Sequence, residues 1–119
     1  MKSMSGLLGI AHFKFHEGKI EEFKRLSGKC RQIVQKHDTG TLRYDIFINA
    51  EQSEAIVVEE YVDAQALMDH STHIGDELSA AIMATASVHG ELLGELSDEF
   101  RAQLKGSPVQ PFAPFLCLD

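Results

Sequence analysis

The chain has 119 residues, of which 44% are hydrophobic and 24% are charged, and its formal net charge is −7. This length fits one domain, residues 1–119, near the size at which pairing with a second copy often completes the core. No segment approaches the ~18 unbroken apolar residues that a membrane span needs. The eleven Lys and Arg form no broad basic face of the kind that nucleic-acid binding requires. The composition therefore disfavours both membrane proteins and nucleic-acid-binding proteins.

The N-terminal twelve residues contain one Lys and too short an apolar run for a secretory signal, and Met4 offers an alternative start. We therefore expect a soluble, cytoplasmic protein. The two cysteines, Cys30 and Cys117, are too few for a disulfide scaffold. We expect both to be reduced and buried.

Alternation of apolar residues predicts a strand over residues 7–15, with Phe13 on one face and His12 on the other. Apolar residues at helical spacing then predict a helix over 19–37. The residues Asp38, Thr39 and Gly40 stop this helix, because glycine adopts the positive φ of a helix end.

Two further strands, 41–49 and 55–62, form a predicted hairpin around a polar loop. If the hairpin closes symmetrically, Tyr44 faces Glu59 and Leu42 faces Tyr61. Both faces of the second strand are apolar, so a slip of one residue would present Glu60 in place of Glu59. The double apolarity indicates a strand that is covered on both sides.

The second half begins with Asp63 as the N-cap of a helix that starts at Ala64 and is broken by Gly75. The histidines His70 and His73 border the buried face of this helix. A helix over 77–86, a strand over 88–95 and a short helix over 98–105 follow.

The C-terminal arm, residues 107–119, is apolar and carries prolines at 111 and 114, so any strand in it lies at a sheet edge. The apolar side chains of this tail favour burial, and we expect a second subunit to bury them. The order of elements predicts an α+β ferredoxin-like fold, an antiparallel sheet with helices on one face. In a homodimer, two such sheets can face each other as a barrel.

Four features of the sequence support a family resemblance: EGKIEEFKRL after the first strand, GTLRY at residues 40–44, Glu59 two residues before Tyr61, and His70 eleven residues after Glu59. Together, over residues 8–93, they resemble the antibiotic biosynthesis monooxygenase family of dimeric α/β barrels. That family includes cofactor-independent oxygenases of phenols and quinols, haem-degrading enzymes and an isomerase.

The resemblance implies that Glu59, Tyr61 and His70 line or brace a cavity between sheet and helices, with Tyr44 beside them. Two departures stand out. Members often have Trp where Tyr61 stands, whereas this chain has no Trp, and its tail after Gly94 is longer than in compact members.

We interpret His70, Glu59 and Tyr44 as candidate catalytic residues. His70 is a candidate general base because imidazole titrates near neutrality, and Glu59 is the candidate carboxylate that holds it. Tyr44 could donate a hydrogen bond to a phenolate or carbonyl of the substrate. The alternative is structural: a core histidine bonded to Glu59 that pins helix to strand, and Tyr44 as a cross-strand aromatic.

We expect Tyr61, His12, His73 and His89 to contribute to substrate binding, although solvent-facing positions explain His12 and His89 equally well. His70 and His73 have the i, i+3 spacing of a metal clip, but the sequence places no further ligand, so we predict no metal site.

These residues lead to one hypothesis with open alternatives. His70, held by Glu59, removes a proton from an electron-rich hydroxyarene, and the carbanion reduces dioxygen in a dry pocket. This reaction needs no cofactor, and no nucleotide-binding motif appears in the sequence. The alternatives are isomerisation or another proton transfer in the same pocket, haem degradation, and a non-catalytic small-molecule-binding or dimerisation module.

Overall fold

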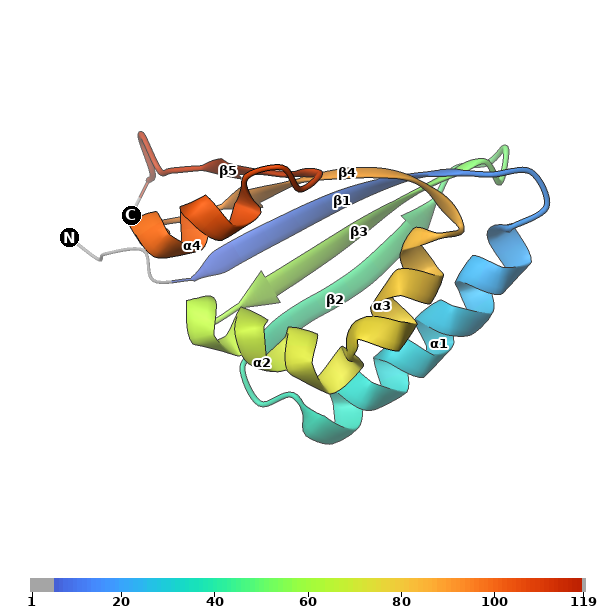
Figure 1. Ribbon diagram of the computed structural model, residues 1–119, viewed down its shortest axis with the longest axis horizontal. Helices are drawn as coiled ribbons and strands as arrows, with labels where there is room; N and C mark the ends of the chain where they lie inside the picture. The colour runs from blue at the N-terminus through green and yellow to red at the C-terminus, as the bar shows by residue number, and fades with distance from the viewer. Residues whose placement is uncertain (1–5, 119) are drawn as a thin grey trace.

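The computed structural model describes residues 6–118, so Met4 lies outside the described residues. The elements in chain order are β1 (Leu7–Phe15), α1 (Ile20–His37), β2 (Thr41–Ile48), β3 (Glu54–Tyr61), α2 (Ala64–Ile74), α3 (Asp76–Met83), β4 (Ala86–Leu93), α4 (Asp98–Leu104) and β5 (Val109–Phe112) (Figure 1). Within the described residues, no helix is both long and apolar enough to cross a membrane.

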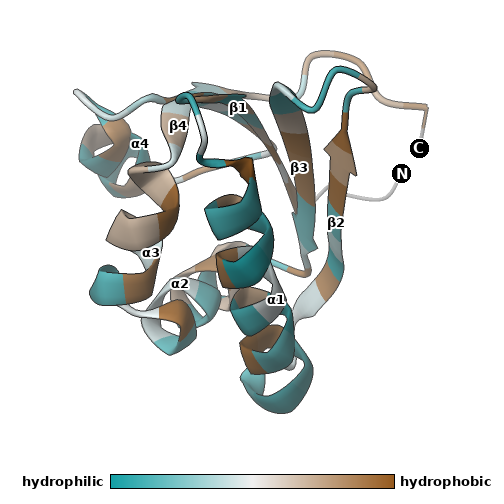
Figure 2. Cartoon of the chain, turned by 90° about the vertical axis from the view of Figure 1, so that its right-hand side faces the viewer, coloured by the Kyte–Doolittle hydropathy of each residue, from teal (hydrophilic) through white to brown (hydrophobic). Residues whose placement is uncertain are grey.

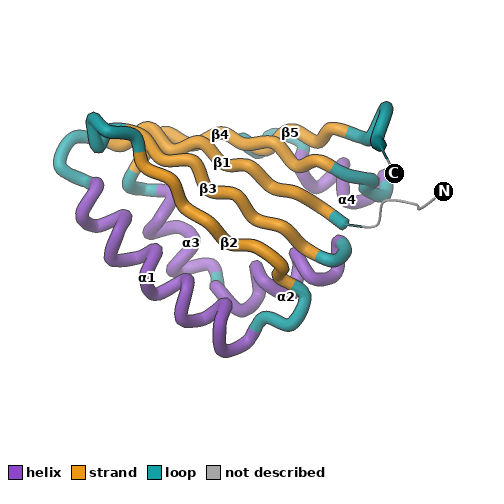
Figure 3. Tube along the Cα trace, turned by 180° about the vertical axis from the view of Figure 1, so that it is seen from behind, coloured by secondary structure: helices purple, strands orange, loops and turns teal. Residues whose placement is uncertain are grey.

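The strands form one five-stranded sheet in the order β2-β3-β1-β4-β5. The four helices lie on one face of this sheet (Figure 1), and the tube seen from behind shows the other face without helices (Figure 3). The predicted α+β ferredoxin-like fold is therefore confirmed. The sheet is mixed rather than antiparallel, because the chain turns back through α4 and β5 pairs with β4 in parallel.

The core lies between the sheet and α1, where buried side chains from three strands meet Phe23. The ring centroid of Phe23 lies 5.0 Å from that of Phe13 and 4.9 Å from that of Phe15. Burying such a side chain stabilises a fold by about 1.5–3 kcal/mol. In Figure 2, β2 and β3 carry hydrophobic residues and α1 alternates between hydrophilic and hydrophobic segments, as expected of an amphipathic helix.

The hairpin of β2 and β3 has the predicted register over most of its length, since Tyr44 pairs with Glu59 and Ile46 pairs with Val57. Glu59 and not Glu60 is thus on the helix-covered face. The predicted pairing of Leu42 with Tyr61 is wrong. An irregularity between Thr41 and Arg43 inserts one residue, so that Thr41 pairs with Tyr61 and the side chain of Leu42 is exposed.

The start of β2 passes very close to α2 at Gly40. A Cβ at this position would lie 2.5 Å from the Cβ of Ala66, so only glycine fits without a shift. The carboxylate of Asp63 accepts a hydrogen bond of 2.9 Å from the backbone N–H of Ala66, which confirms it as the N-cap of α2. This close approach brings the end of α1 and the last turns of α2 together.

The C-terminal segment continues along the edge of the sheet as β5 and then leaves it. Ser97 caps α4 by accepting a hydrogen bond of 3.1 Å from the backbone N–H of Phe100. Beyond β5, Phe115 is 98% exposed, and Cys117 is exposed as well. The prediction that Cys117 is buried is therefore wrong, because within residues 6–118 the segment beyond β5 is left exposed. The prediction for Cys30, which is 1% exposed, is confirmed.

Candidate functional site

A pocket of about 560 Å³ lies between the sheet and the helices. Its wall is mostly apolar and includes residues from β1, β3, β4 and all four helices. This volume falls within the range of about 300–1,000 Å³ that is typical of small-molecule sites. A pocket of this size can enclose a compact ring system.

Four polar side chains in the pocket wall come from adjacent elements. Tyr44 and Glu59 are register partners on β2 and β3, and Tyr61 lies two residues beyond Glu59 and so on the same face. His70 on α2 completes the group, with its ring centroid 5.4 Å from that of Tyr61 and 5.9 Å from that of Tyr44. His70 is 8% exposed and Tyr61 is 1% exposed. The structure thus brings together the four residues that the resemblance singled out.

The carboxylate that is hydrogen-bonded to His70 is Asp38, at the end of α1, whereas the predicted partner Glu59 lies at ion-pair distance on the other side of the ring. Nδ1 of His70 lies 2.7 Å from Oδ2 of Asp38, and Nδ1 of His73 lies 2.6 Å from Oδ1 of the same carboxylate. The Thr41 hydroxyl donates a third hydrogen bond to Asp38, also of 2.7 Å. The sequence analysis missed this role for two reasons. Asp38 is 32 residues from His70, and its position was already accounted for by the end of the helix.

Asp38 is ionised in this environment. Burial of its carboxyl, whose side chain is 3% exposed, works against ionisation, but the hydrogen bonds from His73, His70 and Thr41 together outweigh burial and lower the pKa of Asp38 below its usual value. An ionised carboxylate can only accept hydrogen bonds, so Nδ1 of His70 carries a hydrogen. In neutral His70 the lone pair therefore lies on Nε2.

Glu59 lies on the other side of the His70 ring. Its Oε1 atom is 3.6 Å from Nε2 of His70, and the hydroxyl of Tyr61 donates a hydrogen bond to the same oxygen. The imidazole is thus flanked by Asp38 at Nδ1 and by Glu59 at Nε2. Two carboxylates in these positions stabilise the imidazolium that forms when His70 takes up a proton.

The two tyrosines remain protonated donors. Burial, together with the nearby negative charge of Glu59, raises the pKa of Tyr61 far above its usual value, and burial likewise raises the pKa of Tyr44. Burial also raises the pKa of the Cys30 thiol beside Tyr44, so Cys30 lacks the thiolate character of a nucleophile. The chemistry of this wall is proton transfer and hydrogen bonding.

Ser27 on α1 is a second residue that the sequence analysis did not single out. Its Oγ atom is buried, lines the pocket, and has no hydrogen-bond partner among the described residues. A buried hydroxyl without a partner is costly, and a polar atom of a bound ligand would satisfy it. Its position among the apolar residues of α1 was the available signal in the sequence.

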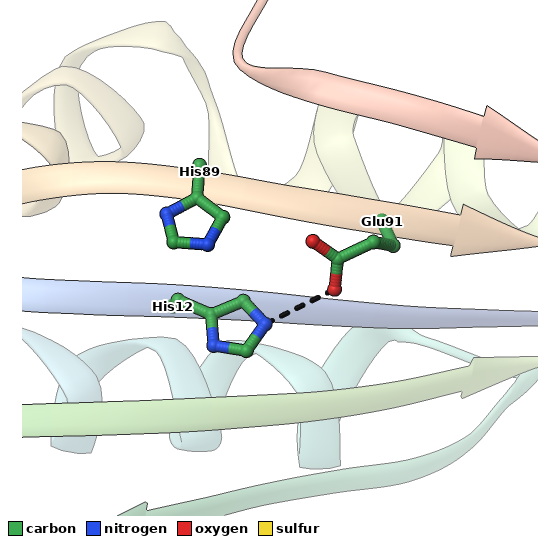
Figure 4. Close-up of side chains that lie close together, drawn as sticks. All are labelled: His12, His89 and Glu91. Carbon is green, nitrogen blue, oxygen red and sulfur yellow. Dashed lines mark hydrogen bonds and ion pairs between the residues drawn. The ribbon is translucent and has the colours of Figure 1, made fainter.

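Of the remaining three predicted binding residues, His89 is part of the pocket wall and His12 and His73 are not. His73 is bonded to Asp38 and lies outside the pocket wall, so its contact with the site is through that carboxylate. Strand β4 borders the pocket from Val88 to Leu92, but the rings of His12 and His89 lie on the face of the sheet without helices (Figure 4). Strand alternation explains this, because Phe13 and Val88 occupy the covered face.

Comparison with solved structures supports the fold. MupZ from Pseudomonas fluorescens is 25% identical, with a TM-score of 0.81 over 97% of this chain and 94% of MupZ. Rv0793 from Mycobacterium tuberculosis is 21% identical, with a TM-score of 0.66 over 79% of this chain and 98% of its own. SnoaB, a cofactor-independent oxygenase from Streptomyces nogalater, is 12% identical, with a TM-score of 0.63 over 78% of this chain and 95% of its own.

These similarities differ in extent. The match to MupZ covers nearly the whole chain and so includes α4 and β5, whereas the other two leave about a fifth of the chain unmatched. At their identities, Rv0793 and SnoaB show the fold alone. No curated protein matches the sequence. The family model described as antibiotic biosynthesis monooxygenase matches residues 7–75, more than half of the chain and the part that contains Asp38, Tyr44, Glu59 and His70, and the chain therefore belongs to the antibiotic biosynthesis monooxygenase family.

Proposed function

We propose that the protein is a cofactor-independent monooxygenase that acts on a small, electron-rich aromatic substrate of the quinol type. The observation that carries this proposal is the His70 imidazole, which is held at Nδ1 by Asp38 and lines a mostly apolar pocket. Family membership supports the reaction class, and the fold similarity to SnoaB, a cofactor-independent oxygenase, agrees with it.

The first step is removal of a proton by Nε2 of His70 from the CH₂ carbon of the substrate's keto tautomer, which is conjugated with the aromatic ring. The proton converts His70 to imidazolium between the carboxylates of Asp38 and Glu59, while the electron pair remains on the aromatic carbanion. General-base catalysis of this kind contributes about 10²- to 10⁴-fold in rate. A mostly apolar wall strengthens the electrostatic interactions that stabilise the ion pair.

The second step uses dioxygen as the oxidant. The carbanion gives electrons to dioxygen, a carbon–oxygen bond forms, and the resulting peroxide takes up the proton held by His70. Loss of the second hydrogen from the same carbon breaks the oxygen–oxygen bond and leaves a carbonyl and one water molecule. The CH₂ carbon is thereby oxidised to C=O by one O₂, which is balanced without a further reductant.

The neutral hydrogen-bond donors in the pocket wall orient the substrate. Tyr44 and Ser27 both line the pocket, and the hydroxyl of either can donate a hydrogen bond to a phenolic or carbonyl oxygen. Tyr61 is engaged with Glu59, so its contribution is to fix that carboxylate beside His70. His73 has the corresponding role for Asp38.

A second candidate is a proton-transfer reaction without oxygen, such as isomerisation. It is favoured by a specific observation: the pocket pairs a base at His70 with neutral hydroxyl donors, which is sufficient to remove a proton at one atom and return it at another. The two candidate reactions share the first step and differ in whether the carbanion then reacts with dioxygen.

We further propose that the protein acts as a homodimer in which a second copy covers the face of the sheet without helices. On this face Phe47 is 55% exposed and Ile56 is 41% exposed, and the arm after residue 107 exposes Phe115 and Leu116. Apolar surface of this kind is typical of an interface. The arm would then pack against the partner.

The proposal is tested by oxygen uptake with a panel of hydroxyarenes and quinols under metal-free conditions. We expect stoichiometric oxygen consumption and product formation by the wild type, and a decrease of at least about 100-fold in kcat/KM for His70→Gln. The control is His16→Gln, which changes an exposed histidine in the turn after β1.

Each alternative has its own outcome. Substrate conversion without oxygen uptake, equally sensitive to His70→Gln, would establish the isomerisation reading. Saturable ligand binding with no turnover and no effect of His70→Gln would establish a non-catalytic binding module. A Soret shift on titration with haemin, followed by loss of the porphyrin spectrum, would establish haem degradation.

A further inference from the structure

A second cluster of ligating side chains lies on the face of the sheet opposite the pocket. His89 and Glu91 are two residues apart on β4 and therefore project on the same side, and His12 on β1 is the register partner of His89. Figure 4 shows the three side chains gathered in front of β1 and β4, with the helices behind the sheet. This cluster has no part in the function proposed above.

The three side chains are already arranged around a common point. The rings of His12 and His89 are stacked, with centroids 4.5 Å apart and planes 8° from parallel. Nε2 of His12 lies 3.0 Å from Oε1 of Glu91, and one ligating atom of each residue lies within 4.8 Å of the others. Around a tetrahedral Zn²⁺ with bonds of about 2.0–2.1 Å, neighbouring ligand atoms are roughly 3.3 Å apart. Small side-chain rotations would produce that spacing.

The surroundings of the cluster suit a cation better than an anion. Ile56 is in register with His12, and Ile10 is in register with Glu91, whereas on the other side Glu91 is in register with the neutral Gln110. Lys14 lies two residues along β1 from His12, where it is in register with Glu54 and Ser87. No cationic side chain is therefore in register with the three ligands, and one carboxylate supplies negative charge to the site.

We propose that His12, His89 and Glu91 form a site for one divalent transition-metal ion. Two imidazole nitrogens and one carboxylate oxygen match the preferences of Zn²⁺ and similar ions, whereas Mg²⁺ and Ca²⁺ favour sites made of oxygen atoms. Because all three ligands rise from one face of the sheet, the fourth position points away from the sheet. In the isolated chain that position is open to water, and in the proposed homodimer it faces the second copy. The sheet separates this ion from His70, so the site is independent of the proton-transfer chemistry.

The test uses full-length, tag-free protein freed of metal with a chelator and titrated with Zn²⁺ by calorimetry and with Co²⁺ by visible absorption. We expect the wild type to bind one ion per chain, with the absorption bands of four-coordinate Co²⁺. Loss of an outer-shell partner alone costs about 10- to 100-fold in metal affinity. Removing a ligand in His89→Ala or Glu91→Gln should therefore weaken binding at least tenfold.

Matched controls make the outcome decisive. His16→Ala removes an exposed histidine outside the cluster and should bind the ion as the wild type does. His89 is exposed, so His89→Ala is expected to fold, which circular dichroism and thermal unfolding will check. The proposal would be overturned by an absence of saturable binding, or by equal binding to His89→Ala, Glu91→Gln and the wild type. The cluster would then be only an ion pair beside two stacked imidazole rings. Loss of binding in His73→Ala instead would place the ion at Asp38 and overturn the proposal as well.

Discussion

The two faces of the sheet each carry histidines beside a carboxylate, yet the two clusters differ in environment. On the covered face, His70 is 8% exposed and bonds to a carboxylate with 3% side-chain exposure. On the open face, His12 and Glu91 have side-chain exposures of 35% and 29%, and His89 is exposed. The buried cluster fixes one tautomer and shields its reactive nitrogen from most of the solvent, whereas the open cluster of the isolated chain leaves its side chains accessible. The same residue types therefore suit a base in one place and an ion ligand in the other.

The strongest test of the covered cluster is Asp38→Asn. An amide can donate to Nδ1 of His70, which would move the hydrogen to Nε2 and remove the base from the pocket. We expect kcat to fall by about 10²- to 10⁴-fold with little change in KM, as measured by oxygen uptake or substrate conversion.

Because Asp38 acts through His70, its positioning role needs a separate readout. The pH profile of kcat should change in Asp38→Asn, and the ¹⁵N shifts of His70 should report the other tautomer. A variant that loses activity only in proportion to a loss of folded protein, with the wild-type tautomer retained, would contradict this role.

The open face is tested by Phe47→Asp. Burial of a phenylalanine contributes about 1.5–3 kcal/mol, so removing it from the proposed interface should raise the dimer dissociation constant by roughly 10- to 100-fold. Analytical ultracentrifugation measures this change. Gln32→Asp introduces the same charge at an exposed position of α1 and should leave association unchanged. A wild-type protein that sediments as a monomer at micromolar concentration would refute the dimer.

The contact that joins α1 to α2 is tested by Gly40→Ala. The added Cβ would collide with Ala66, and overpacking of this kind costs about 1–3 kcal/mol in the free energy of unfolding. Gly28→Ala is the matched control, because a Cβ there meets nothing within 4 Å and alanine favours a helix by about 0.5–1 kcal/mol. Chemical denaturation should show opposite signs for the two variants.

The smallest predicted effect is the pH dependence that Asp38 gives to the free energy of unfolding. Despite its burial, hydrogen bonds from His73, His70 and Thr41 place its folded-state pKa below the ordinary value near 3.9. Its contribution is therefore complete above the unfolded pKa and is lost as the pH falls through the folded pKa. Denaturation of the wild type at a series of pH values below the ordinary pKa of Asp should show this loss, and Asp38→Asn should lack it.

The local pattern of apolar and polar residues was sufficient to predict much of the fold. Alternation placed Phe13 and His12 on opposite faces of β1, and the symmetric hairpin placed Tyr44 opposite Glu59, both as the structure has them. The inserted residue near Leu42 was not predictable, because a bulge depends on the backbone path between β2 and α2. The parallel pairing of β5 was missed for a similar reason, since it depends on the direction in which α4 returns the chain.

The candidate site was predicted only in part. His70, Glu59, Tyr44 and Tyr61 do meet in one pocket. The partner of His70 could not be identified, because α1 brings Asp38 to it from a distant part of the sequence. The expectation that His12 and His89 share that pocket conflicts with the strand alternation itself, which already placed His12 opposite the apolar face.

The helix α4 and the turn before β5 supply one end of the pocket wall, through Phe100, Gln103, Leu104 and Pro108. These residues follow the last antiparallel strand and belong to a different part of the chain from Asp38 and the hairpin that carries Glu59. The length and shape of the bound molecule can therefore be altered by exchanging the chain terminus while the reacting groups stay in place. Because of this separation, substitutions in the C-terminal part offer protein engineers a way to change substrate selectivity without changing the proposed catalytic residues, in a chain of little more than a hundred residues.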